Sequence, residues 1–152
     1  MSDTYEIKAA VLAAKENCDL PVCVTMTFDQ DGKLLTGATV EAAAVMCEGL
    51  GVDAMGFNCG LGPVQVAKLL PQMLAATSLP IIINPNAGLP VEKDGKTCFE
   101  VGPEEYAELM YELAQQGPSI IGGCCGTTPA HIEAMIKKCK ELQPGGYRDC
   151  KL

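Results

Sequence analysis

The sequence predicts an α/β fold in which short buried strands alternate with helices and pair in parallel. Runs rich in β-branched and apolar residues begin near residues 21, 53, 80 and 119, and a segment with helical periodicity follows each of them. The starts are about one strand-helix unit apart, and strands joined by helices pair in parallel. A further helix precedes the first strand. With 152 residues, 48% of them apolar, the chain can bury the core that such a sheet needs.

Local signals predict the first three strand-helix units. Thr39 can cap the second helix, and Pro63 occupies the favoured first position of the third, in which Pro71 is expected to cause a kink or an interruption. The polar stretch up to Gly102 is expected to be a loop. The elements expected before this loop are a helix over 4–17, a strand over 21–28, a helix over 40–50, a strand over 53–59, a helix over 64–77 and a strand over 80–86.

The last unit follows the polar loop. A helix is expected over 103–116, with acidic residues at its N-terminal end, where the helix dipole favours them. A strand is expected over 119–123, and Thr128 can cap a last helix over 129–142. The inner stripe expected for that helix consists of Ile132, Met135, Ile136 and Cys139. We expect residues 1–143 to form one domain and residues 144–152 to form a tail.

Four strand-helix units do not close a barrel by themselves. A TIM-type (β/α)8 barrel has eight strands and about 250 residues. A doubly wound, flavodoxin-like sheet is the alternative, but that fold is expected to begin with a strand, whereas here a helix comes first. The sequence therefore predicts an α/β protein that forms the C-terminal half, (βα)4, of a TIM-type barrel.

Composition excludes several classes of function. Lys and Arg number 11 against 19 Asp and Glu, a net charge of −8, and the sequence has no basic tract to neutralise nucleic-acid phosphates. The N-terminus is acidic and polar, unlike a secretion signal. No stretch approaches the roughly 18–20 apolar residues of a membrane span. We expect a cytoplasmic protein with neither nucleic acid nor membrane as a partner.

The nine cysteines support a reducing compartment. Their number is odd and most lie in apolar segments, which is typical of buried thiols and metal ligands rather than of a disulfide framework. Cys23, Cys47 and Cys139 are expected to be small core residues.

Metal-ligating side chains follow three of the predicted strands. Cys59 ends the second strand, Asn86 ends the third, and Cys124 and Cys125 follow the fourth. The carboxyl ends of barrel strands converge on one mouth, so three thiolates and an amide oxygen are expected to meet there. Such thiolates select zinc. Taken alone, Cys59 is also compatible with a buried thiol, and the vicinal pair with a redox pair or a tight turn. We expect His131 on a solvated helix face, not as a ligand.

Four segments carry recognisable motifs, namely 24–28 (VTMTF), 56–63 (GFNCGLGP), 85–90 (PNAGLP) and 122–132 (GGCCGTTPAHI). With these motifs the chain resembles the homocysteine S-methyltransferase (homocysteine-binding) domain family, and within it most strongly the homocysteine domain of cobalamin-dependent methionine synthases. The resemblance extends over about residues 1–142, and the run from Gly122 to Pro129 is its most specific part.

The resemblance implies zinc-dependent methyl transfer to the homocysteine thiolate, giving methionine. In that family the cysteines matching Cys59, Cys124 and Cys125 bind zinc, and the asparagine matching Asn86 fills an exchangeable fourth position in some members. The implied methyl donor is methylcobalamin, carried on a partner protein or domain.

The resemblance covers only the C-terminal half of the family's barrel. An N-terminal half-barrel subunit or a second copy of this chain would have to supply the rest, and a corrinoid protein is a further implied partner. The alternative interpretation is a non-catalytic zinc-binding or assembly module, or a truncated remnant of such an enzyme. A vicinal-thiol redox protein is a third interpretation, in which Cys59 and Asn86 have no role.

Overall fold

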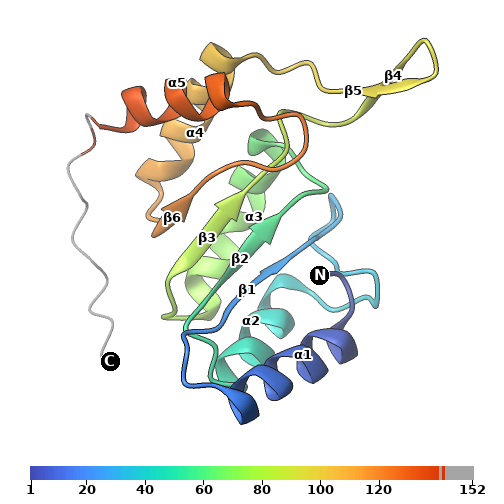
Figure 1. The fold of residues 1–152 in the computed structure, drawn as a ribbon, viewed down its shortest axis with the longest axis vertical. Coiled ribbons are helices and arrows are strands. Elements are labelled where there is room, and N and C mark those ends of the chain that lie inside the picture. Colours follow the sequence, from blue (N-terminus) through green and yellow to red (C-terminus); the bar gives the residue numbers. More distant parts are fainter. Residues whose placement is uncertain (141, 143–152) are drawn as a thin grey trace.

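The computed structural model describes residues 1–140 and 142, and these form a four-stranded parallel sheet flanked by five helices (Figure 1). The strand order is β1-β2-β3-β6, so each strand lies beside its predecessor in the βα series. The strands of this sheet are β1 (Cys23–Met26), β2 (Ala54–Asn58), β3 (Ile81–Asn84) and β6 (Ile120–Ile121). The helices are α1 (Thr4–Asn17), α2 (Val40–Gly49), α3 (Pro63–Ala76), α4 (Pro103–Gln115) and α5 (Pro129–Cys139). The predicted tail, 144–152, lies outside the described residues.

The predicted order of helices and parallel strands is confirmed. Thr39 caps α2 through a hydrogen bond from the Ala42 N–H to its hydroxyl, 3.3 Å. The expected interruption at Pro71 is wrong, because α3 runs through this residue to Ala76. The strands are shorter than the β-branched runs predicted, since pairing stops where the chain turns toward the next helix.

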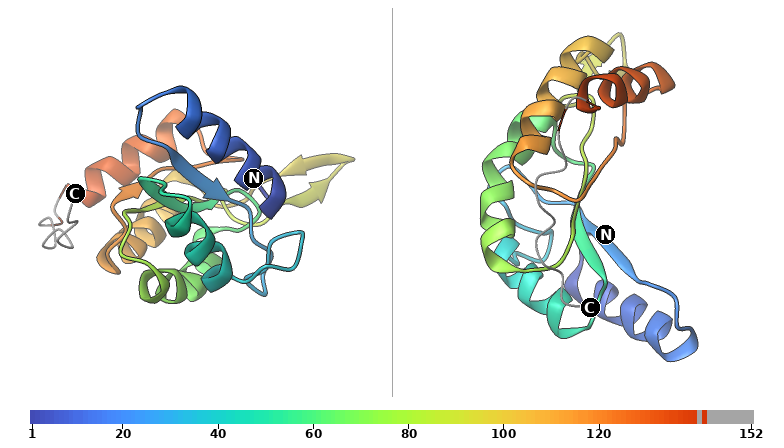
Figure 2. Two further views of the ribbon diagram at one scale, coloured as in Figure 1. Left: turned by 90° about the horizontal axis from the view of Figure 1, so that it is seen from below. Right: turned by 90° about the vertical axis from the view of Figure 1, so that its left-hand side faces the viewer.

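A hairpin was missed within the polar stretch before α4. It consists of β4 (Val91–Lys93) and β5 (Lys96–Cys98), which pair antiparallel and project from the body of the molecule (Figures 1 and 2). Its side chains are mostly exposed, so the sequence carries no alternation of apolar and polar residues that would reveal these strands.

The hydrophobic core lies on one face of the sheet. Alternate strand residues point toward the helices, among them Met26 of β1, Phe57 of β2 and Ile83 of β3, all at most 2% exposed. Helices α2, α3 and α4 lie along this face, and α1 and α5 lie at the two ends of the arc that the helices form (Figure 2, right). No helix among the described residues is long and apolar enough to cross a membrane.

The opposite face of the sheet has a different composition. It carries Ala54 and Gly56 from β2 and Ile82 from β3, and no helix within the described part of the chain covers it (Figure 2, right). Ile82 is buried at 6% exposure but does not belong to the core cluster. Ile120 of β6, which pairs with Ile82 of β3, is 48% exposed. The helical layer of this α/β fold therefore covers only one face of the sheet.

The free edge of β1 accepts the start of the chain. The Met1 amino group donates to the Thr25 carbonyl over 2.9 Å, and the Thr27 N–H donates to the Met1 carbonyl over 2.8 Å. This is the hydrogen-bond pattern of a parallel neighbouring strand. Met1 thus occupies the position at which a strand preceding α1 would end.

Two expectations about burial are wrong. Cys23 is exposed because β1 is an edge strand and this side chain points to the uncovered face, whereas Cys47 is buried as expected and Cys139 is partly buried. Ile136 of the expected inner stripe is 47% exposed, whereas the buried residues of α5 are His131 and Met135.

Candidate metal centre

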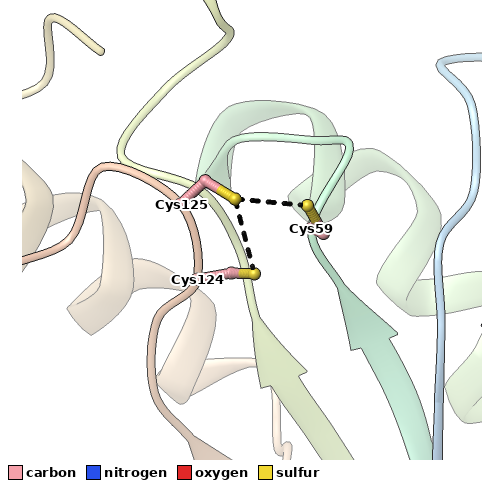
Figure 3. A group of neighbouring side chains, drawn as sticks. All are labelled: Cys59, Cys124 and Cys125. Atoms are coloured by element: carbon pink, nitrogen blue, oxygen red, sulfur yellow. Dashed lines mark hydrogen bonds between the residues drawn. The ribbon is translucent and has the colours of Figure 1, made fainter. Parts of the chain in front are cut away.

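The structure brings together the three cysteines that the sequence placed at strand ends (Figure 3). Their Sγ atoms all lie within 4.8 Å of one another. The Cys59 Sγ lies 3.6 Å from that of Cys125, and the Cys124 Sγ lies 4.0 Å from that of Cys125. Cys59 and Cys124 are partly buried and Cys125 is exposed, so the cluster is open to a ligand from outside.

The parallel sheet explains why these residues meet. The carboxyl ends of β2, β3 and β6 lie along one edge, and each strand is followed by a loop that bonds to its neighbour. The Cys59 N–H donates to the Asn84 carbonyl (3.1 Å), and the Cys124 N–H donates to the Pro85 carbonyl (2.8 Å). The Ala87 N–H in turn donates to the Cys125 carbonyl (2.9 Å). The loop after β3 therefore joins the two cysteine-bearing loops on either side of it.

Left-handed backbone shapes both cysteine loops. Cys59 has φ 56°, a conformation that is uncommon outside glycine, and Gly60 follows it with φ 65°. Gly126, directly after the vicinal pair, has φ 80°, and a Cβ there would lie 2.4 Å from Phe99. Non-glycine residues in this region cost about 1–3 kcal/mol each and tend to occur at functional sites.

The cluster favours one negative charge at Cys59. Burial raises the pKa of the Cys59 thiol, but hydrogen bonds from the Gly60 N–H and from neighbouring side chains outweigh this effect and leave the pKa below its usual range. These side chains are those of Cys125, Cys124 and Asn86. The hydrogen bonds to Cys59 and Cys124 raise the pKa of Cys125 to about 11. The Cys59 thiol therefore loses its proton more readily than the Cys125 thiol, and a cation is needed to hold the cluster as thiolates.

Asn86 is buried at the edge of the cluster, 3% exposed. Its Oδ1 accepts a hydrogen bond from the Cys125 N–H over 3.0 Å, and its side chain also bonds to the Cys59 thiol. A carbonyl oxygen has two lone pairs, so Oδ1 retains one acceptor position. The structure thus places all four residues that the sequence singled out in one group.

The expectation that His131 lies on a solvated helix face is wrong. It is only 7% exposed, and its Nε2 lies 2.9 Å from the Val101 carbonyl. Its Nδ1 accepts from the Thr128 N–H over 3.2 Å and lies 2.8 Å from the Thr128 hydroxyl. His131 therefore fixes the start of α5 and is not on a solvated face.

Two residues beside the cluster were missed. Tyr106 of α4 is fully buried, and its hydroxyl donates toward the Gly122 carbonyl (2.8 Å) and the Pro85 carbonyl (3.3 Å). Asn58, directly before Cys59, has a buried Oδ1 with no hydrogen-bond partner. An aromatic residue in the acidic first turns of the helix was the only available signal for Tyr106, and nothing in the sequence distinguishes Asn58 from other strand residues.

Sequence comparisons find relatives of this chain. The family model described as homocysteine S-methyltransferase matches residues 1–139. The chain is 36% identical over 156 residues to a methionine synthase of Mycobacterium leprae, an alignment that covers 96% of this chain and 13% of that protein.

Two solved structures share the fold. The homocysteine methyltransferase MmuM of Escherichia coli, in its apo form, has a TM-score of 0.72 and 24% identity over 90% of this chain and 47% of that one. The metallated form of MmuM has a TM-score of 0.71 and 23% identity, covering 91% of this chain and 42% of that one. The chain thus spans less than half the length of these relatives.

Proposed function

The chain belongs to the homocysteine S-methyltransferase family, and from this membership we propose that it activates the thiol of homocysteine for zinc-dependent methyl transfer, giving methionine. The observation that carries the proposal is the group of three Sγ atoms within 4.8 Å at the carboxyl ends of β2 and β6. One of the solved relatives, MmuM, has a metallated form, which agrees with a metal at the corresponding site.

The cysteine geometry suits zinc. Zn–S bonds are about 2.3 Å long, so two thiolates on a tetrahedral ion lie about 3.8 Å apart. The observed distances of 3.6 Å and 4.0 Å are on either side of this value. We propose Cys59, Cys124 and Cys125 as the permanent ligands. We propose the Asn86 Oδ1 as an exchangeable fourth ligand that gives way to the substrate sulfur.

The chain's own residues hold and expose the reacting sulfur. When bound, zinc would lower the pKa of a coordinating substrate thiol, which is otherwise about 8.5 and mostly protonated at neutral pH. The exposed side of the cluster, at Cys125, leaves room for that thiol. Its proton passes to solvent, and a sulfur lone pair then forms the new bond to the methyl carbon. The bond from that carbon to the donor breaks, and its electron pair stays with the donor.

The proposed donor is methylcobalamin on a corrinoid protein or domain. The methionine synthase resemblance supports this donor. We propose the reducing cytosol as the compartment, because free thiols must persist in the cluster.

We further propose that residues 1–143 form half of a TIM-type barrel, completed by an N-terminal half-barrel subunit or by a second copy of this chain. Coverage of less than half of each solved relative supports this view. So does the uncovered face of the sheet with its exposed Ile120, since a barrel interior would be filled from the other half. The parallel pairing of Met1 with β1 supports it too, because the same edge would receive the preceding strand.

Metal content tests the function. The purified chain is expected to hold about one zinc ion per molecule, and Cys59→Ser, Cys124→Ser and Cys125→Ser each to lose most of it. Cys18→Ser, an exposed cysteine outside the cluster, is the matched control and should keep the metal. A well-folded chain without stoichiometric zinc would refute the proposal.

A second assay separates an enzyme from a non-catalytic module. Homocysteine-dependent demethylation of methylcobalamin is measured with this chain alone and with a candidate N-terminal half. Turnover that requires both the intact cysteines and the complementing half is the expected result. Zinc binding without turnover in either condition would favour a non-catalytic zinc-binding module instead.

A further inference from the structure

The side chain of Tyr106 reaches from α4 to the point where two strands end. It is fully buried, and its hydroxyl lies 2.8 Å from the Gly122 carbonyl oxygen and 3.3 Å from that of Pro85. Gly122 follows β6 and lies two residues before Cys124, whereas Pro85 follows β3 and lies directly before Asn86. One phenol group therefore bonds to the backbone on both sides of the gap between these strands.

Strand pairing itself stops just short of this point. The ladder between β3 and β6 ends at Ile83 and Ile121, with one further bond from the Gly122 N–H to the Ile83 carbonyl (2.8 Å). Beyond it, the Cys124 N–H donates to the Pro85 carbonyl. The Tyr106 hydroxyl bonds to the carbonyls of Gly122 and Pro85, where the ladder gives way to the cysteine loop.

The aromatic ring is held from two directions. The ring makes an edge-to-face contact with the His131 ring, with centroids 5.6 Å apart and the planes at 79°. His131 is itself fixed by the Val101 carbonyl and by Thr128, at the far end of the cysteine loop. The loop from Gly122 to Thr128 is therefore held near its start by Tyr106 and at its end by His131, which contacts Tyr106.

We propose that Tyr106 is a positioning residue of the metal centre, whose hydroxyl sets the distance between the ends of β3 and β6 so that Cys124 and Cys125 face Cys59. This inference rests on the proposed zinc site. The hydroxyl acts through its hydrogen bonds to the carbonyls of Gly122 and Pro85. Outer partners of this kind typically change metal affinity by about 10–100-fold.

The test compares Tyr106→Phe with Tyr111→Phe. Both remove one hydroxyl from α4, but Tyr111 lies beside Lys138, away from the cysteine loop. Zinc affinity is measured by competition with a chelator, and the cobalt(II)-loaded chains give the thiolate-to-cobalt and ligand-field absorption bands. Tyr106→Phe is expected to weaken binding about 10–100-fold and to shift the ligand-field bands. Tyr111→Phe should match the unmodified chain in both readouts.

Isosteres keep the test valid if the phenylalanine variant folds poorly. At position 106, 4-aminophenylalanine retains an N–H donor and should restore affinity and spectrum, whereas 4-methylphenylalanine retains the volume without a donor and should not. Lower thermal stability with unchanged affinity and bands would assign Tyr106 a merely structural role and overturn the inference. Failure of the unmodified chain to bind either metal would instead refute the proposed function, and the inference with it.

Discussion

At the scale of single residues, the candidate site depends on local conformations that most side chains avoid. Cys59 itself is left-handed, which turns its Sγ back toward the loop after β6. Gly126 gives that loop its own left-handed turn directly beside Phe99. The sequence predicted that Cys59, Cys124 and Cys125 lie close together, because residues that follow the strands of one parallel sheet lie at one edge of it. It did not reveal the strain at Cys59, since cysteine has no special preference for this region.

Gly126 offers a way to separate backbone strain from a side-chain clash. Gly126→Ala adds a Cβ that would lie 2.4 Å from Phe99, whereas Gly95→Ala adds one at a similar φ of 71° with nothing within 4 Å. We expect Gly95→Ala to cost about 1 kcal/mol of unfolding free energy and to leave zinc binding unchanged. Gly126→Ala should cost more and should also weaken zinc binding, because the loop that carries Cys125 must shift. Urea unfolding and chelator competition measure the two effects, and equal behaviour of the two variants would contradict this account.

At the scale of elements, the sequence predicted helices better than strands. Helix α1 has the expected limits, and α2 to α4 deviate by about one residue, because capping residues and helix-start prolines mark helix ends chemically. The ends of a strand are set by pairing with its neighbours, and a single sequence does not show this pairing. All four strands of the sheet are therefore shorter than predicted. The hairpin β4–β5 was missed for the same reason: its exposed residues have no apolar periodicity.

The same core packing that fixes α2 predicts a dependence on alkaline pH. The buried stripe of this helix ends at Cys47, and burial raises the pKa of the Cys47 thiol to about 11. In the unfolded chain the thiol titrates near 8.5. Its contribution to stability is therefore complete below about pH 8.5 and is lost as the pH rises toward 11, because unfolding then releases a proton.

Cys47→Ala should remove this dependence. The free energy of unfolding of the unmodified chain is expected to fall more steeply between pH 8.5 and 10.5 than that of the variant, by at most about 1.4 kcal/mol per pH unit. At pH 7 the variant should be less stable by roughly 1 kcal/mol, since a small cavity remains. Urea unfolding of the reduced, chelator-treated proteins gives both values. The exposed Cys18→Ala control should retain the full alkaline slope, and a retained slope in Cys47→Ala would show that other thiols cause it.

At the scale of the whole molecule, the fold is complete on one side and open on the other. The helices cover the face that carries Met26, Phe57 and Ile83, while the face with Ile82 and Ile120 is bare of helices in the described part of the chain (Figure 2). The number of strand-helix units was sufficient to predict this asymmetry, because four units cannot surround a barrel interior. The sequence of this chain does not predict whether another segment or molecule packs on the open face, because such packing depends on side chains outside these four units.

The proposed closing surface can be tested at Ile120. This side chain is 48% exposed on the open face, at the edge strand β6, so Ile120→Lys should barely change the stability of the isolated chain. Against a second half barrel, however, the lysine would be buried without a partner. We expect association with an N-terminal half, or self-association if a second copy closes the barrel, to weaken at least about tenfold, which corresponds to about 1.4 kcal/mol.

Leu35→Lys is the matched control, because Leu35 is 84% exposed in the loop between β1 and α2. Sedimentation equilibrium and co-purification measure the two kinds of association. Equal association of both variants with either partner would place the interface elsewhere.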